Sequence, residues 1–298
     1  HRRHHARPRA GRLVRRPDAR RPGRHPDHHA RVHGPAPRRV LRPRPRPHRR
    51  PGAPLSLPPS PGPDDVVVIL SGAGLSAASG VPTFRGAGGW WRGRQATQLA
   101  TPEAFDADPD LVRDFYAHRR RAMDGIAPND GHRAMARLQA AWGPERVVLV
   151  TQNVDGLLQQ AARDEGVDVD VIEMHGTLWT VRCAMEEDHP RVPVDPADPD
   201  PRGTCAACGD LLRPDVVWFG EMPRQMERIQ GDLIRCHHFL AVGTSGVVYP
   251  AAGFVNLAKG TGAVCTEVNP TPTGGGFHHA LAEGSETALP RLFASWGA

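Results

Sequence analysis

Residues 66–77, Val-Val-Val-Ile-Leu-Ser-Gly-Ala-Gly-Leu-Ser-Ala, join an apolar run directly to a glycine-rich turn. The run Val66–Leu70 is continuous and mostly β-branched, which is typical of a parallel strand that is buried on both faces. The turn Gly72–Ala77 fits the G-x-G-x-x-A pattern, in which glycines let the backbone approach a pyrophosphate at the start of a helix. A tight strand-to-helix turn without a ligand would show the same pattern, so this motif alone leaves both interpretations open.

Five further apolar runs predict strands, and helical patterns lie between them. Thr101 and Asp108 each stand before a proline and predict a capped helix start. Strands that alternate with helices indicate a doubly wound α/β fold with a parallel, Rossmann-like sheet. The predicted strands are Val147–Val150, Val169–Ile172, Val216–Phe219, Phe239–Val242 and Ala263–Val268.

Polar residues follow several of these runs. Asn153 and Asp155 come after one strand and His175 after the next, while Gly243-Thr244-Ser245 follows a later one. Ligands of open α/β sheets bind beyond the carboxyl ends of the strands, so we expect these residues to meet at a binding site. Since the ordinary pKa of histidine is near neutrality, His175 is the candidate general base, although a histidine before a glycine is often structural.

The positive charge of the chain is concentrated before residue 51. Residues 1–50 contain 18 arginines and two acids, whereas the remainder carries 20 basic and 30 acidic residues, so the net charge of +6 averages a basic tail and an acidic body. We expect residues 1–63 to be disordered, because Arg, Pro and His cannot bury enough apolar surface. Two interpretations of this tail are a nucleic-acid-binding arm and a segment that is not native, since it starts with His and has the bias of GC-rich DNA read as protein.

The sequence contains no run of about 18 apolar residues and no apolar stretch behind its charged start, so neither a membrane span nor a secretory signal is predicted. Its five cysteines include the pair Cys205-Ala-Ala-Cys208. Without an export signal, this spacing indicates metal binding before a disulfide. We therefore expect a cytoplasmic protein.

Six motifs in order resemble those of the sirtuin family. The resemblance covers residues 64–298, and the tail before Pro63 matches nothing in the family. It implies a catalytic domain over 64–298, in which a Rossmann-like domain carries a smaller split domain built from a helical module at about 85–130 and a zinc-ribbon-like module at about 178–213. The motifs are residues 72–85, Thr151–Leu157, His175-Gly176, Val216–Glu221, Gly243–Ser245 and Glu267–Asn269.

The resemblance implies an NAD-dependent removal of acyl groups from the lysines of proteins or peptides, with nicotinamide and O-acyl-ADP-ribose as products. His175 and Asn153 would be the catalytic residues, and Phe84 would shield the site from water. The substrate would pair as a strand with Val217, Trp218, Phe219 and Gly220. The implied NAD contacts are Gly72, Ala73, Gly74, Ser76, Ala77, Phe84, Arg85, Gln152, Asn153, Asp155, Gly243, Thr244, Ser245 and Asn269.

Two other functions stay open at this point. Mono-ADP-ribosyl transfer would use the same NAD site with a different acceptor. Nucleic-acid binding would depend on the Arg-rich tail, and therefore on that tail being expressed.

Tyr116 and Arg119 lie three residues apart in a predicted helix and so share a face. Spacing alone favours an ordinary amphipathic helix. The pair is also similar to the Tyr-x-x-Arg pair of the sirtuin branch that removes acidic acyl groups. A guanidinium and a phenol could together bind the carboxylate of succinyl- or malonyl-lysine.

The sequence departs from the family at its zinc module, which normally has two Cys-x-x-Cys pairs. Cys205 and Cys208 form the second pair, but the first has only Cys183, with Glu186 at the matching position. A structural zinc takes four ligands. Glu186, Asp188 or His189 could supply the fourth one, and the alternative is weak zinc binding or none.

Overall fold

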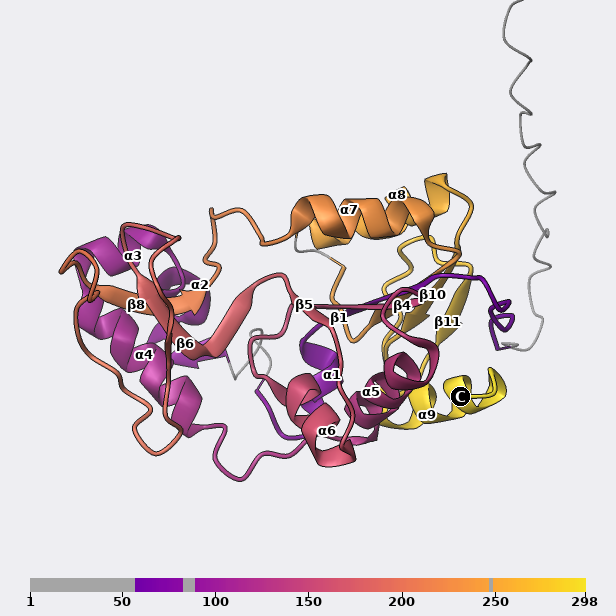
Figure 1. The fold of residues 1–298 in the computed structure, drawn as a ribbon, viewed down its shortest axis with the longest axis horizontal. Helices are drawn as coiled ribbons and strands as arrows, with labels where there is room; N and C mark the ends of the chain where they lie inside the picture. Colours follow the sequence, from indigo (N-terminus) through magenta and orange to yellow (C-terminus); the bar gives the residue numbers. More distant parts are fainter. Residues whose placement is uncertain (1–56, 83–88, 247–248) are drawn as a thin grey trace, which may run out of the picture. The chain divides into compact units, whose positions relative to one another are not determined.

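The computed structural model describes residues 57–82, 89–246 and 249–298. Its largest sheet has six parallel strands in the order β11-β10-β9-β1-β4-β5 (Figure 1). Renumbered along the chain, this is the 3-2-1-4-5-6 order of the Rossmann fold, so the predicted fold class is confirmed. The strands are β1 (Val67–Ser71), β4 (Val147–Thr151), β5 (Val171–Glu173), β9 (His238–Val242), β10 (Val264–Val268) and β11 (His279–Leu281).

Helices cover both faces of this sheet (Figure 1). Alternate residues of β1 point to opposite faces: Val67 and Ile69 belong to one core cluster, and Val68 and Leu70 to the other. The continuous apolar run at 66–70 is explained by this burial on both faces. On the Val67 face lie α1 (Ala73–Ala77), α5 (Asp130–Trp142), α6 (Leu157–Glu165) and α9 (Ser285–Ser295), and on the other α7 (Met226–Arg235), η2 (Ala251–Gly253) and α8 (Phe254–Gly260).

A three-stranded antiparallel sheet of order β7-β6-β8, a two-stranded antiparallel sheet of β2 and β3, and the helices α2, α3 and α4 form the rest of the described fold. The two predicted helix starts are confirmed, because the Thr101 side chain accepts from the Ala104 N–H and the Asp108 side chain from the Leu111 N–H. The elements are β2 (Trp90–Trp91), β3 (Arg94–Gln95), α2 (Ala96–Leu99), α3 (Pro102–Ala107), α4 (Pro109–Arg121), β6 (Gly176–Cys183), β7 (Val192–Pro193) and β8 (Leu212–Val216).

The strand predicted over Val216–Phe219 is wrong in its bounds. The strand β8 ends at Val216, and residues 219 and 220 lie in a turn. The Val217 N–H still donates to the His175 carbonyl at 2.9 Å, in register with the Gly176–Val216 pair of the small sheet. The Phe219 N–H instead donates out of the sheet, to the Ala100 carbonyl at 2.9 Å, so the strand does not extend to Phe219. No helix in the part of the chain that the structure describes is long and apolar enough to cross a membrane.

Candidate active site

The glycine-rich turn lies where the strand order reverses, between β1 and β9. The Gly74 N–H donates to the Gly243 carbonyl at 2.9 Å, so the turn after β1 packs directly on the turn after β9. A Cβ on Gly74 would lie 2.6 Å from the Gly243 Cα, a distance that no side chain tolerates. Both positions therefore require glycine, and backbone alone forms this part of the crevice at the carboxyl ends of the strands.

Ser76, Asn153 and Asp155 form one hydrogen-bonded group beside this turn. The Ser76 hydroxyl donates to the Asp155 carboxylate at 2.7 Å. The Asn153 amide donates both its protons, to the Gly72 carbonyl at 3.0 Å and to the Ser76 Oγ at 3.1 Å. Asn153 Oδ1 is then left to accept from a ligand. Burial raises the pKa of the Asp155 carboxyl, against the opposing hydrogen bonds from Leu157 and Ser76.

His132 belongs to the same group, although no sequence pattern points to it. Its Nδ1 accepts from the Asn129 N–H at 3.2 Å, so the proton of the neutral ring is on Nε2, which lies 3.2 Å from the Ser76 Oγ. Ser76 therefore accepts from His132 while it donates to Asp155. Burial first, and the nearby Arg133 second, lower the pKa of His132 to about 4, so the ring is neutral at physiological pH.

His132→Gln is expected to make the protein less sensitive to acid. Because the pKa is lower in the folded than in the unfolded chain, the unfolded state binds more protons between about pH 4 and 6.5, and stability is lost as the pH falls through this range. From pH 7 to pH 5 the histidine should remove about 2 kcal/mol from the free energy of unfolding. Urea unfolding at both pH values measures this loss. Equal losses in the wild type and in His132→Gln would contradict the assignment.

His175 has the geometry of a general base. Its Nδ1 lies 3.1 Å from the Gln152 carbonyl oxygen, which can only accept, so Nδ1 carries the proton and Nε2 presents a lone pair. Burial lowers the pKa of His175, against the opposing bond to Gln152, and this favours the neutral ring at pH 7. The residue follows the end of β5 and is half-buried.

The remaining predicted cofactor contacts lie along the same ends of the strands. Gln152 follows β4, and its side-chain amide is 3.4 Å from the Ser71 carbonyl. Asn269 donates from Nδ2 to the Thr244 carbonyl at 3.0 Å, which ties the ends of β10 and β9 together. Ala73, Ala77 and Ser245 are exposed. Phe84 and Arg85 lie outside the described residues.

One apolar cluster brings two of the predicted substrate residues, Tyr116 and Trp218, to the loop after β4. Tyr116 from α4, Val154 from the loop after β4, and Trp218 from the segment after β8 all belong to it. Tyr116 is fully buried, and its hydroxyl oxygen lies 2.9 Å from the Trp218 indole nitrogen. Arg119 is half-buried one turn along α4, and burial lowers its pKa against the opposing charges of Tyr116 and Asp155. Phe219 and Gly220 are exposed, and Val217 is half-buried.

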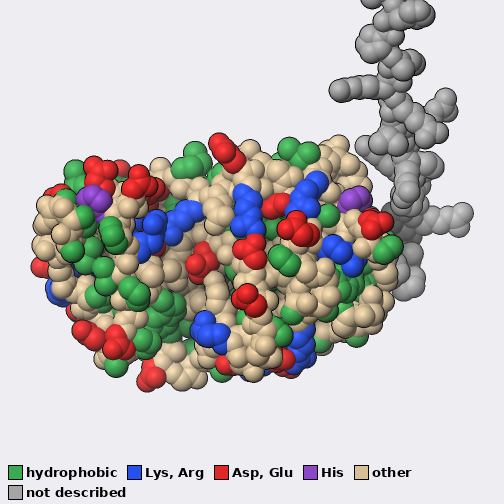
Figure 2. Space-filling model, viewed as in Figure 1, with side chains coloured by type: hydrophobic (Ala, Val, Ile, Leu, Met, Phe, Trp, Pro, Cys, Tyr) green, Lys and Arg blue, Asp and Glu red, His purple; other side chains and the backbone are tan. Residues whose placement is uncertain are grey.

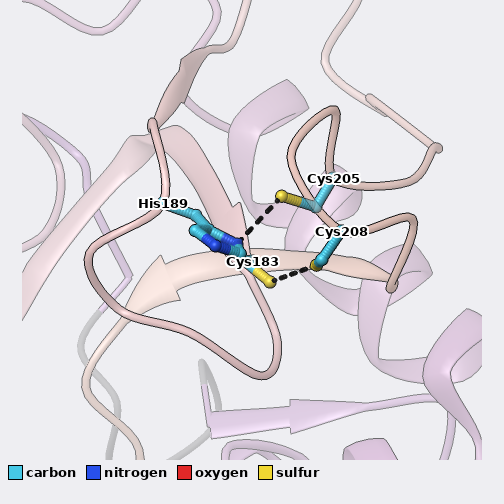
Figure 3. Close-up of side chains that lie close together, drawn as sticks. All are labelled: Cys183, His189, Cys205 and Cys208. Carbon is cyan, nitrogen blue, oxygen red and sulfur yellow. Dashed lines mark hydrogen bonds between the residues drawn. The ribbon is translucent and has the colours of Figure 1, made fainter.

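Cys183, His189, Cys205 and Cys208 form a cluster whose possible ligand atoms all lie within 4.8 Å of one another (Figure 3). The Cys183 and Cys208 sulfurs are 3.5 Å apart, and the Cys205 sulfur is 3.4 Å from His189 Nδ1. Ligands about 2.1–2.3 Å from a tetrahedral zinc would be separated by roughly 3.4–3.8 Å, so this set fits the metal. Of the three candidates for the fourth ligand, His189 is the one that lies with the cysteines.

Purified protein is therefore expected to hold close to one zinc per chain, with His189 as the fourth ligand. His189→Ala should lower the zinc content and the melting temperature, because a structural zinc contributes directly to folding free energy. Glu186→Ala is the matched control and should retain the metal. Elemental analysis of the three proteins measures the content. Full zinc occupancy in His189→Ala, or loss of zinc in Glu186→Ala, would contradict this ligand set.

The fold and these contacts define a nucleotide-binding protein of the Rossmann class that carries a Cys/His cluster with the spacing of a metal site. Residues 72–250 match the model of the Sir2 family. The chain belongs to the Sir2 family. It is 46% identical over 211 residues to an NAD-dependent protein deacylase of Escherichia coli strain K12, covering 70% of this chain and 72% of that protein. It is 41% identical over 255 residues to the mitochondrial NAD-dependent protein deacylase sirtuin-5 of Canis lupus familiaris, covering 76% and 81%.

Solved structures agree with this assignment. A Sir2 homologue in complex with NAD superposes with a TM-score of 0.70 at 34% identity, covering 79% of this chain and 91% of the other. A mutant Sir2 homologue in complex with 2'-O-acetyl ADP ribose has the same TM-score and identity and covers 79% and 93%.

Proposed function

We propose that this protein removes acyl groups from lysine side chains and prefers acyl groups that end in a carboxylate. NAD-dependent protein deacylation is the activity of the Sir2 relatives, and this protein is an NAD-dependent deacylase of that family. The preference for acidic acyl groups is the further part of the proposal. The observation that carries it is the position of Arg119 one helical turn from Tyr116, whose buried ring packs in the same cluster as Val154 of the loop after β4.

The residues around the turn fit NAD. Because Gly74 packs closely on Gly243, this part of the crevice is lined by backbone and not by side chains. A pyrophosphate can approach the turn closely only where side chains are absent. Asn153 keeps an acceptor oxygen for a ribose hydroxyl, and the Asp155 carboxylate can accept from a carboxamide. We assign Gln152 to the ribose as well, and Phe84 to shielding the site.

When bound, NAD supplies a ribose carbon that carries nicotinamide as a leaving group. The chain supplies the proton transfer and the positioning. His175 Nε2 has its lone pair available and would take a proton from a hydroxyl of the bound ribose. Ser76, which accepts from His132, holds the Asp155 carboxylate in place, and this carboxylate would orient the nicotinamide end of the cofactor. The peptide lies along residues 217–220, where backbone carbonyls can bind its main chain.

A panel of peptides tests the acyl preference. Acetyl-, malonyl-, succinyl- and butyryl-lysine versions of one peptide are incubated with NAD, and kcat/KM is measured for each. The proposal expects the succinyl and malonyl peptides to exceed the butyryl peptide, which is similar to them in length but has no carboxylate. A butyryl peptide that is processed as well as the succinyl peptide would contradict the acidic preference while leaving deacylation itself intact.

A cytoplasmic location and a catalytic domain over residues 64–298 stay predictions. Nucleic-acid binding is predicted only for the tail, and residues 1–56 lie outside the described part of the chain. On the face shown in Figure 2, basic and acidic side chains are intermixed. Acyl-lysine proteins or peptides are the proposed partners, because the relatives are protein deacylases.

A further inference from the structure

Trp218 connects the predicted peptide segment, residues 217–220, to Tyr116 of the pair that is predicted to bind the acyl carboxylate. Its indole Nε1 lies 2.9 Å from the Tyr116 hydroxyl oxygen, and both side chains are almost completely buried. An indole N–H can only donate, so the phenol oxygen is the acceptor in this bond. Because the Tyr116 oxygen is the acceptor in this bond, the hydroxyl proton of Tyr116 is available for donation to another group.

No acceptor for that proton lies within hydrogen-bonding distance among residues 57–82, 89–246 and 249–298. A buried donor without an acceptor is destabilising. A ligand oxygen that reaches Tyr116 would remove this destabilisation. Arg119, which interacts electrostatically with Tyr116, makes a carboxylate oxygen the acceptor that the local charge favours.

The indole is held in place from several sides. The Arg213 guanidinium lies over its ring, 3.3 Å from the centroid, and the Phe105 ring packs 5.4 Å away. Arg213 binds Glu221 through two bonds of 2.6 and 3.0 Å, and Glu221 in turn accepts from the Trp218 backbone N–H at 2.7 Å. Trp218 therefore has little freedom to turn its N–H away from Tyr116.

We infer that Trp218 is a specificity-determining positioning residue, whose indole N–H fixes the Tyr116 hydroxyl so that it donates to the carboxylate of an acidic acyl group. This inference rests on the proposed acidic preference. It assigns a role to the Trp218 side chain, in addition to the peptide contact predicted for its backbone.

Trp218→Phe tests the inference, because it keeps an aromatic ring and removes the N–H. The measured quantity is the ratio of kcat/KM for the succinyl peptide to that for the acetyl peptide, since damage to the shared peptide segment affects both. One hydrogen bond of about 1 kcal/mol predicts a roughly three- to tenfold fall in this ratio, expressed in the KM of the succinyl peptide. Added to Tyr116→Phe, the same substitution should cause no further fall.

An unchanged ratio in Trp218→Phe, or an equal fall in the presence and absence of the Tyr116 hydroxyl, would overturn the inference. Arg119→Met separates this failure from a failure of the proposed function. If Arg119→Met lowers the ratio and Trp218→Phe does not, the acidic preference stands and only the role of Trp218 is wrong. If the wild type has no acidic preference, both are wrong.

Discussion

His175→Ala is expected to lower deacylation turnover by about 10²–10⁴, the usual effect of removing a positioned general base. The bond from Nδ1 to the Gln152 carbonyl fixes the tautomer, so Nε2 is the only ring atom that can take a proton. Alanine has no group that replaces it. Steady-state turnover on a saturating acyl peptide and NAD measures the loss.

NAD binding by His175→Ala should change little, because the glycine turn and the Ser76–Asp155 pair are separate contacts. His237→Ala is a suitable control, since this histidine is exposed and lies at the other end of the sheet, before β9. A folded His175→Ala protein with near-normal turnover would show that another group is the base.

Arg119→Met is expected to raise the KM for a succinyl-lysine peptide about tenfold or more. A hydrogen bond between charged groups contributes about 1.5–3 kcal/mol, and about 1.4 kcal/mol corresponds to a factor of ten. The methionine side chain keeps much of the length of the arginine side chain and removes its positive charge. Kinetics with succinyl and acetyl peptides should show a selective loss for the succinyl peptide, because an acetyl group has no carboxylate to bind.

Arg121→Met provides the matched control, because Arg121 is exposed at the end of the same helix. It should leave the succinyl-to-acetyl ratio unchanged. Equal losses on both peptides in Arg119→Met would contradict a role of Tyr116 and Arg119 in selecting acidic acyl groups, and the pair would then belong to an ordinary amphipathic helix.

The sequence alone is sufficient to predict the positions of those site residues that directly follow strands. His175 and Asn153 are predictable from their places after apolar runs, because the carboxyl ends of parallel strands meet at one edge. His132 is not predictable in this way, since its contact with Ser76 joins residues 56 positions apart. Likewise, the strand stops short of Phe219 because the Phe219 N–H donates to the Ala100 carbonyl, a partner from outside the sheet. His189 is one of three possible zinc ligands in the sequence, and only the folded loop places it beside Cys205.

The identity of the products tests the central claim most directly. The purified protein is incubated with NAD and an acyl-lysine peptide, and all masses are recorded. Deacylation predicts a peptide that has lost its acyl group, together with equal amounts of nicotinamide and acyl-ADP-ribose. An unchanged peptide, with ADP-ribose attached to protein, would contradict the account and identify the protein as an ADP-ribosyltransferase.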